Sequence, residues 1–293
     1  MMAVSESKDK KTVGYHQGEV KTVISVEDVN RQAQKLGSGV SEETINNLIK
    51  DEPFLKIENL RAGYGKMEIL HDFTLKISKG ESLCLIGPNG AGKSTVLHSI
   101  FGFTKIFSGS ISVRNENGEQ NITNLTPSEK LKEAGIAYIL QDNSVFPGMT
   151  VEENLWMGGY LKEKPEEAKE AAEEIFAKYE RLANRRHQPA RVLSGGERRL
   201  LEISRALVMK PQVLLVDEPS IGLEPRFIEM VFEILYDLQN KEGKTIIMVE
   251  QNAKKGLEFA DIGYVLVAGE LALAGKGNEL LENPEVGRLF LGG

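Results

Sequence analysis

The sequence predicts an α/β fold with a mixed sheet at its core, an antiparallel β segment near the N-terminus and an inserted helical subdomain. Four short apolar runs, SLCLI, IAYIL, VLLV and TIIMV, have the continuous hydrophobic character of strands that are covered on both faces. Helical patterns separate these runs, which favours parallel strands joined by crossover helices. Before them, FLKIENL and ILHDFTLKI alternate between apolar and polar residues, as antiparallel strands with one solvated face do.

The antiparallel parts of the sheet are expected at both ends of the regular region. FLKIENL has the pattern of an edge strand, and ILHDFTLKI is predicted to pair with it. Near the C-terminus, YVLVAGELALAG predicts a β-hairpin with Ala268, Gly269 and Glu270 at its turn.

A long amphipathic stretch interrupts the alternation of strands and helices. PEEAKEAAEEIFAKYERLANR carries glutamates and lysines on one side and apolar residues on the other, and LLEISRALVMK adds more helix before the next strand. We therefore interpret residues of about 142–208 as a helical subdomain inserted into the α/β core. The apolar stripe consists of Ala168, Ala171, Ala172, Ile175, Phe176, Tyr179 and Leu182.

Residues 1–52 form an N-terminal extension that differs in composition from the domain predicted for residues 53–293. Its first twenty residues are polar and rich in lysine and glutamate, which favours disorder. VEDVNRQAQKL and SEETINNLIKDE are candidates for short helices, the second with Ser41 as its N-cap. The extension is either a poorly packed tail or expression remnant, or a regulatory or docking segment.

Composition restricts the class of function. The net charge of −7 argues against a nucleic-acid partner, because nucleic-acid binders usually have a basic excess. The single cysteine, Cys84, excludes an internal disulfide framework and lies in an apolar run where a buried thiol is expected. No run of residues is long and apolar enough for a membrane helix, and the N-terminus lacks the apolar segment of a signal peptide. If the chain serves a membrane, it does so through a partner.

The motif GPNGAGKST follows the SLCLI strand and precedes a helical pattern, which is the setting required of a P-loop. Backbone N–H groups of such a loop close around phosphate oxygens, and the helix N-terminus adds its positive dipole. Lys93 is expected to bridge the β- and γ-phosphates of ATP, and the Ser94 hydroxyl is expected to bind Mg²⁺. The predicted nucleotide-binding loop comprises Gly87, Pro88, Asn89, Gly90, Ala91, Gly92, Lys93, Ser94 and Thr95.

The run VLLVDEP supplies the acidic residues that a P-loop NTPase needs on a neighbouring strand. Its apolar residues deliver Asp217 to the C-terminal end of the strand, where parallel sheets bind their ligands. Asp217 is predicted to hold Mg²⁺ through water, and Glu218 is predicted to polarise the water that attacks the γ-phosphate. Two solvated surface carboxylates are the alternative, which the buried strand before them disfavours.

LSGGE, residues 193–197, adds a second glycine-rich helix start between these two motifs. In this order and spacing the sequence resembles the ATP-binding-cassette (ABC) ATPases over residues of about 54–293. The resemblance implies a dimer of two cassettes arranged head to tail, in which Ser194, Gly195 and Gly196 contact the nucleotide bound to the partner subunit.

The same resemblance assigns three further residues. Tyr64 in GYGKMEIL matches the aromatic residue that stacks on adenine, although a tyrosine packed in the core is the alternative. Gln141 matches the glutamine that approaches Mg²⁺ and the attacking water, with a solvated loop amide as the alternative. Gln251, after TIIMVE, holds the position where most cassettes have a histidine that contacts the γ-phosphate. SIGLEP departs from the family pattern, because Glu224 stands where Asp is usual.

Several stretches, including VFPGMTVEENLWMGGY, EPSIGLEP and MVEQNAKKGLEFADIGYVL, resemble the ATP-binding subunits of branched-chain amino-acid importers. A urea or amide importer, a lipopolysaccharide-type exporter and a soluble ABC ATPase are the alternatives, and QDNSVF is not the usual loop of this branch. The resemblance implies transmembrane permease subunits, an indirect link to a solute-binding protein and a place on the cytoplasmic face of the inner membrane. The candidates for permease contact, with core packing as the alternative, are Phe146, Pro147, Met149 and Trp156.

Overall fold

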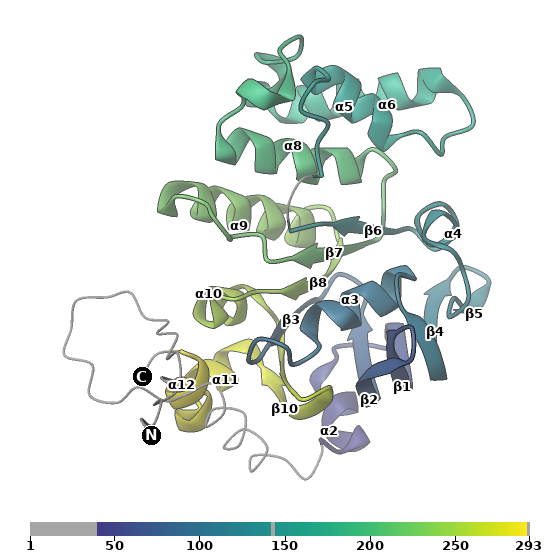
Figure 1. Cartoon of the computed structure of the whole chain (residues 1–293), viewed down its shortest axis with the longest axis vertical. Helices are drawn as coiled ribbons and strands as arrows, with labels where there is room; N and C mark the ends of the chain where they lie inside the picture. The colour runs from purple at the N-terminus through teal and green to yellow at the C-terminus, as the bar shows by residue number, and fades with distance from the viewer. Residues whose placement is uncertain (1–39, 142–143, 292–293) are drawn as a thin grey trace, which may run out of the picture.

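The computed structural model describes residues 40–141 and 144–291, which fold around two β-sheets (Figure 1). The larger sheet has six strands in the order β10-β9-β3-β8-β7-β6. Its parallel strands are β3 (Ser82–Ile86), β6 (Ile136–Ile139), β7 (Val213–Asp217), β8 (Thr245–Val249) and β9 (Ile262–Val267). These include the four continuous apolar runs, so the prediction of a buried parallel core is confirmed.

The parallel strands bury side chains on both faces, as their sequences predict. In β3, Cys84 and Ile86 pack into one hydrophobic cluster, whereas Leu83 and Leu85 pack into the other. The strand is fully buried because helix α10 (Ala253–Phe259) packs against it on one side, and α3 (Lys93–Phe101) with the antiparallel strands covers the other. Burial also raises the pKa of the Cys84 thiol well above its usual range, so this cysteine is an inert core residue.

The helices of the core follow the strands in sequence. The set comprises α3 (Lys93–Phe101), α4 (Pro127–Lys132), α9 (Pro225–Asn240), α10 (Ala253–Phe259), α11 (Gly277–Glu282) and α12 (Pro284–Phe290). The predicted C-terminal hairpin is confirmed: β9 and β10 (Glu270–Lys276) are antiparallel, and the turn residues Ala268 and Gly269 have φ angles of 50° and 83°. Positive φ at both positions is the requirement of a type I′ turn.

The smaller sheet is antiparallel, in the order β2-β1-β4-β5. Its strands are β1 (Pro53–Tyr64), β2 (Met67–Ser78), β4 (Lys105–Asn115) and β5 (Gly118–Asn121). The prediction that FLKIENL forms an edge strand is wrong, because β1 lies between β2 and β4. The sequence gives little sign of this partner, because β4 has three serines and one glycine in its middle, as a loop often does.

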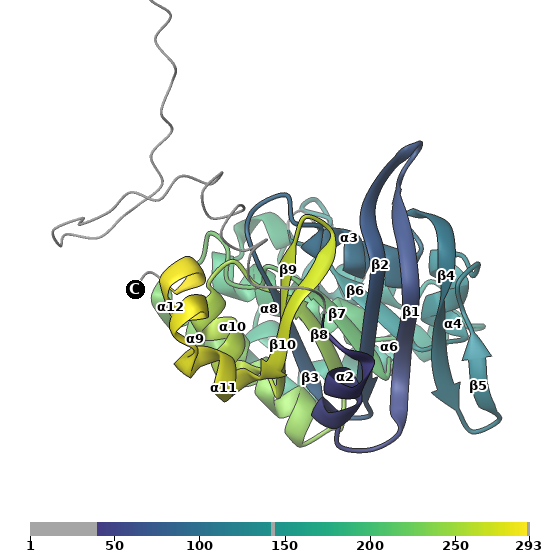
Figure 2. The same ribbon diagram turned by 90° about the horizontal axis from the view of Figure 1, so that it is seen from below.

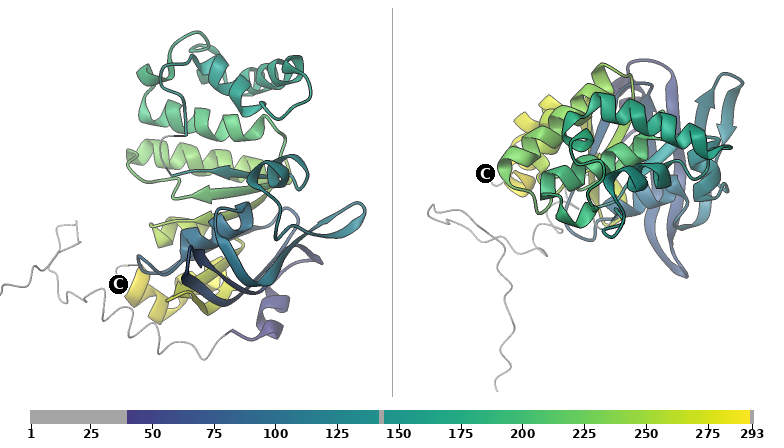
Figure 3. Two further views of the ribbon diagram at one scale, coloured as in Figure 1. Left: turned by 45° about the vertical axis from the view of Figure 1, so that its right-hand side comes forward. Right: turned by 90° about the horizontal axis from the view of Figure 1, so that it is seen from above.

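The inserted helices form a separate layer beyond the β6 edge of the larger sheet (Figures 1 and 3). The layer contains α5 (Val151–Gly158), α6 (Pro165–Lys178), α7 (Glu180–Ala183), the 3₁₀ turn Ala190–Val192 and α8 (Gly195–Leu207). Helix α8 packs against both α5 and α9, so it joins this layer to the core. The apolar stripe of α6 faces inward, with Ala172 fully buried.

Part of the N-terminal extension packs on the core. Helix α2 (Glu42–Leu48) begins at Ser41, whose side chain accepts a hydrogen bond from the Thr44 N–H, as predicted. Ile45 and Leu48 are buried, and Figure 2 shows the helix between β2 and β10. Residues 40–52 therefore do not form a loose tail. The other helix predicted in the extension, over VEDVNRQAQKL, lies outside the described residues.

Candidate functional site

The glycine-rich loop connects β3 to α3, as predicted. Gly87, Gly90 and Gly92 have φ angles of 146°, 82° and 99°, in the region that side chains rarely adopt. A Cβ at Gly87 would lie 2.2 Å from the Leu266 carbonyl oxygen, whereas a Cβ at Gly90 would meet nothing within 4 Å. The loop is therefore packed against β9 on one side and open on the other. No side chain caps the N-terminus of α3, so its first N–H groups are available to an anion.

Lys93 lies folded over this loop. Its Nζ donates hydrogen bonds to the carbonyl oxygens of Gly87, at 2.9 Å, and Pro88, at 3.1 Å. Burial lowers the pKa of Lys93, and the carboxylates of Glu218 and Asp217 oppose this shift. A buried ammonium held by backbone carbonyls fits a triphosphate, because phosphate oxygens bind an ammonium more strongly than neutral carbonyls do.

Asp217 is placed at the C-terminal end of β7, where it meets Ser94. Strand β8 lies between β3 and β7, which corrects the expectation of a directly neighbouring strand. The Ser94 Oγ nevertheless donates to Asp217 Oδ1 at 3.2 Å, and the Tyr138 hydroxyl donates to Asp217 Oδ2 at 2.8 Å. One hydroxyl and one carboxylate fit a Mg²⁺ ion that keeps phosphate and water ligands. The described residues contain no group of three or more His, Cys, Asp or Glu suited to a metal.

Glu218 follows in a left-handed conformation, with a φ of 44°. Its backbone N–H donates to the carbonyl oxygen of Val249 at 2.8 Å, which joins the ends of β7 and β8. A non-glycine residue in this region is uncommon, and such conformations concentrate at functional sites. The conformation is consistent with the predicted catalytic role of Glu218.

The polar end of β8 divides into a buried part and an exposed part. Glu250 is buried and accepts hydrogen bonds from the Ser220 hydroxyl and the Asn252 N–H, both at 2.8 Å. Gln251 is exposed, and Asn252 caps α10 through the N–H of Lys255. Glu250 therefore holds the loop after Glu218, whereas the Gln251 amide is available to a ligand.

Tyr64 ends β1 and is 42% exposed, so it is not packed in the core, and stacking on adenine stays a prediction. Its hydroxyl hydrogen-bonds Nδ1 of His98 on α3, and the two rings meet edge to face. Burial lowers the pKa of His98. An aromatic cluster continues from His98 through Phe103 to Tyr138, so the Tyr64 position is connected to the residue that holds Asp217.

The signature residues lie at the start of α8. Ser194 is the N-cap and forms a capping box with Glu197, while Ser194 and Gly195 are exposed. A Cβ at Gly196 would lie 2.1 Å from the Phe227 ring, which explains the glycine there. Figure 1 shows α8 in the helical layer, beyond β6 and α9 from the phosphate loop. The single chain thus brings the phosphate loop, Asp217 and Glu218 together and leaves the signature apart.

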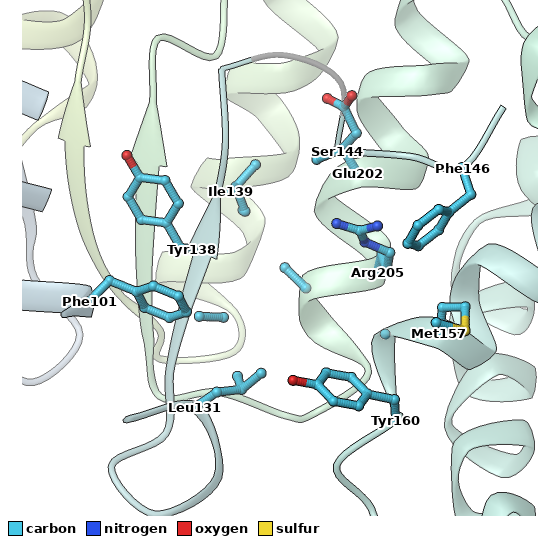
Figure 4. A pocket seen from close by; sticks show the side chains of 13 residues that line it. Phe101, Leu131, Tyr138, Ile139, Ser144, Phe146, Met157, Tyr160, Glu202 and Arg205 are labelled. Atoms are coloured by element: carbon cyan, nitrogen blue, oxygen red, sulfur yellow. The ribbon is translucent and has the colours of Figure 1, made fainter. Parts of the chain in front are cut away.

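Gln141 is exposed after β6. A cavity of about 300 Å³, lined in part by Ile139 of β6, lies between the core and the helical layer. Phe101, Leu131 and Tyr138 line it on the core side, opposite Phe146, Met157 and Tyr160 (Figure 4). Of the predicted contact residues, Phe146 and Pro147 are exposed, Met149 is half-buried, and Trp156 packs against the core cluster.

Four residues that shape the site carry no motif in the sequence. Tyr138 lies within a strand pattern, His98 lies within a helix pattern, and Glu250 is the first of three polar residues after TIIMV. Arg199 lies buried in α8 within a polar-looking stretch. The signal in the sequence is a polar residue at a position that points into the core. That position can be recognised only when the order of the strands is known.

A phosphate loop between β3 and α3, an acidic pair after β7 and a second glycine-rich helix start on a helical layer define a P-loop ATPase of the cassette class. The sequence pattern of the ABC transporter family matches residues 70–221. The chain belongs to this family and is an ATPase.

The relatives agree with that assignment. The chain is 41% identical over 239 residues, 82% of its own length, to all of the high-affinity branched-chain amino acid transport ATP-binding protein BraG of Pseudomonas aeruginosa. It is 40% identical to the probable branched-chain amino acid transport ATP-binding protein LivF of Archaeoglobus fulgidus, covering 81% of this chain and 98% of that one. Similarity extends to the lipopolysaccharide export system ATP-binding protein LptB of Haemophilus influenzae, at 30% identity over 81% and 97% of the two chains.

Solved structures show the same fold. The ADP conformation of an ATP-binding cassette of an ABC transporter aligns with a TM-score of 0.72 at 28% identity, covering 83% of this chain and all of that one. A nucleotide-free cassette aligns with a TM-score of 0.71 at 29% identity, covering 82% and 100% of the two chains. Among the described residues, no helix is long and apolar enough to cross a membrane.

Proposed function

We propose that this chain is the ATP-hydrolysing subunit of an importer for branched-chain amino acids. The observation that carries the proposal is the 41% identity that extends over the whole length of BraG. The second relative of this kind, at 40% identity, supports it. LptB, at 30% identity, makes lipopolysaccharide export the weaker alternative.

The residues of the site have separate roles in this proposal. The loop Gly87–Thr95 binds the triphosphate of ATP through its N–H groups, and Lys93 contacts the β- and γ-phosphates. Ser94, Asp217 and Gln141 hold Mg²⁺, which neutralises charge on the phosphates when bound. Glu218 orients the attacking water and accepts its proton. Tyr64 stacks on adenine.

Gln251 takes the place of a titratable side chain at the γ-phosphate. Its amide donates a hydrogen bond to a phosphate oxygen but carries no charge and no transferable proton at neutral pH. Proton removal therefore falls to Glu218 alone.

The proposed working unit is a dimer of two cassettes, either identical or different. Ser194 and Gly195 are exposed and separated from the phosphate loop of their own chain, which supports their contact with the nucleotide of the partner subunit. ATP then closes the dimer because it contacts both subunits, and hydrolysis removes that contact.

We place the permease contact at the cavity between the core and the helical layer. Its apolar lining, with Phe146 42% exposed, suits a short apolar helix from the membrane subunit. The chain would then lie peripherally on the cytoplasmic face of the membrane, with a solute-binding protein on the other side.

Reconstitution tests the proposal. The chain is assembled in proteoliposomes with the permease subunits that co-purify with it, and ATP hydrolysis is measured with the solute-binding protein added empty or loaded with leucine. Stimulation by loaded protein alone, together with leucine uptake that requires ATP, is the expected result. Stimulation by urea, by an amide or by lipopolysaccharide instead of leucine would overturn the assignment of substrate.

A further inference from the structure

A buried arginine of the signature helix connects three parts of the molecule. Arg199 lies in the second turn of α8 and is 4% exposed. Its Nη1 donates to the Leu140 carbonyl oxygen at 2.7 Å, and its Nη2 donates to the Asp217 carbonyl oxygen at 3.3 Å. These carbonyls belong to the ends of β6 and β7, so one guanidinium bridges two strand ends and a helix.

The two carbonyls immediately precede the two loop residues to which we assign chemistry. Leu140 is followed by Gln141, and Asp217 is followed by Glu218. Each carbonyl shares a planar peptide group with the N–H of the residue that follows it. A hydrogen bond to the carbonyl therefore fixes the orientation of that peptide group. The position of Arg199 therefore sets the spacing between the Gln141 and Glu218 backbones.

The charge of Arg199 is balanced within the same helix. Glu202, one turn further on, accepts from Nη1 through Oε2 at 2.8 Å and is 7% exposed. Glu202 also lines the cavity at which we place the permease contact (Figure 4). The ion pair thus extends from the apolar cavity to the strand ends at the nucleotide site.

We propose that Arg199 is a positioning residue that links the signature helix and the permease-facing cavity to Gln141 and Glu218. Movement of α8, driven by the permease or by the partner's nucleotide, is transmitted through the guanidinium to the spacing of these two loops. The inference rests on the roles proposed above for Gln141 and Glu218. It does not depend on which solute is transported.

The planar guanidinium is what this geometry requires. Two donors on different nitrogens reach two carbonyls at once, whereas a lysine ammonium in the same place is a compact charge on a flexible stem. Arg199→Lys keeps a positive charge beside Glu202 but cannot hydrogen-bond both carbonyls at once. The variant therefore distinguishes the effect of the two hydrogen bonds from the effect of the charge. Arg199→Met paired with Glu202→Gln removes both charges and avoids an unpaired buried carboxylate.

The single tryptophan provides a probe of α8. Trp156 is the only tryptophan in the sequence, and its helix α5 packs against α8. We measure ATP affinity by equilibrium dialysis with radiolabelled ATP, hydrolysis in steady state, and Trp156 emission with and without ATP, using the full chain. Thermal unfolding confirms that each variant is folded, and Arg181→Met, at an exposed arginine of α7, is the matched control.

Arg199→Lys is expected to bind ATP within about 3-fold of the parent affinity while kcat falls roughly 10-fold or more, because positioning is lost and ground-state binding is kept. The ATP-induced change in Trp156 emission should be largely lost in the same variant and intact in Arg181→Met. The Arg199→Met/Glu202→Gln chain should likewise keep its ATP affinity and lose kcat and the Trp156 response.

Three outcomes would overturn the linkage. One is a folded Arg199→Lys chain with parental kcat and Trp156 response. Another is a parallel loss of ATP affinity and kcat, which a merely structural role would produce. The third is a parent chain whose Trp156 emission does not change when ATP is added. Failure of leucine uptake in proteoliposomes would refute the proposed substrate and leave these measurements on the isolated chain unaffected.

Discussion

At the scale of single residues, the end of β8 shows how neighbouring polar side chains serve different purposes. Glu250 is buried and fastens the loop after the acidic pair, through Ser220 and the Asn252 N–H. Gln251, next to it, is exposed. Successive side chains of a strand point in opposite directions, so adjacent polar residues at its end need not share a role.

Gln251→Ala tests whether the exposed amide contacts the γ-phosphate. The variant should bind ADP as the parent does and bind ATP more weakly, by about 1.5–3 kcal/mol for one lost hydrogen bond to a charged oxygen. Equilibrium dialysis with both nucleotides measures this difference. Equal affinities of parent and variant for ATP would show that the amide makes no such contact.

Tyr64→Ala tests the adenine platform. ATP affinity should fall by roughly 1–3 kcal/mol because base stacking is lost, while binding of inorganic triphosphate should change little. Competition dialysis of both ligands gives the comparison, and Tyr64→Phe, which keeps the ring but not the His98 hydrogen bond, is the control. Equal losses for the two ligands in Tyr64→Ala would contradict stacking.

At the scale of elements, helix α2 is the part of the extension that contributes to stability. Its only strongly buried side chains are those of Ile45 and Leu48, and Lys76 of β2 donates hydrogen bonds to Glu42 and Asn46. The helix is too short to persist alone, so docking on β2 and β10 stabilises it.

Ile45→Ala should lower the free energy of unfolding by about 2–5 kcal/mol, because Ile45 is nearly fully buried and its removal leaves a cavity. Asn47→Ala, on the exposed side of the same helix, should change it by less than about 0.5 kcal/mol. Urea unfolding of both variants measures the difference. Equal values for the two would mean that α2 is not docked in solution.

Helix α3 ends against a buried lysine. Lys130 of α4 is fully buried and its Nζ donates to the Ser99 carbonyl oxygen at 3.3 Å, near the C-terminus of α3. Burial lowers the pKa of Lys130 to about 8. A lysine in the unfolded chain has a pKa of about 10.4, so the unfolded state binds more protons between these values. Stability from this group therefore rises with pH from about 8 to about 10.

Lys130→Met removes this dependence. The free energy of unfolding of the parent, relative to the variant, should increase by on the order of 2 kcal/mol between pH 7 and pH 10. Urea titrations at several pH values measure it, with Lys132→Met, at an exposed lysine of the same helix, as control. Parallel curves for parent and Lys130→Met would show that the ammonium does not titrate there.

At this scale, the sequence predicts an element well when local pattern determines it and poorly when its place depends on another element. The buried parallel strands, the phosphate loop, the helical insertion and the β9–β10 turn could be predicted because local pattern determines them. The place of β1 could not, because it depends on β4, whose three serines and one glycine resemble a loop. Tyr138 and Arg199 were missed for the same reason, since their importance lies in contacts with residues far along the chain.

At the scale of the whole molecule, the separation of the signature from the phosphate loop makes association the central prediction. Glu218→Gln should leave ATP affinity nearly unchanged while turnover falls by roughly 10²–10⁴-fold, because the general base is lost. In sedimentation experiments the variant should form a dimer with ATP and remain a monomer with ADP. Normal hydrolysis by the variant would remove Glu218 from its assigned role.

The hairpin turn at Ala268 and Gly269 has a consequence for how the protein is made. The Gly269 N–H donates to the Ala91 carbonyl oxygen at 2.9 Å, and the Gly269 carbonyl accepts from the His71 N–H at 3.0 Å. The phosphate loop is therefore held by a residue that the ribosome adds long after the loop itself. A growing chain cannot form this contact until the turn between β9 and β10 has been synthesised, so this support of the phosphate loop is added late in folding.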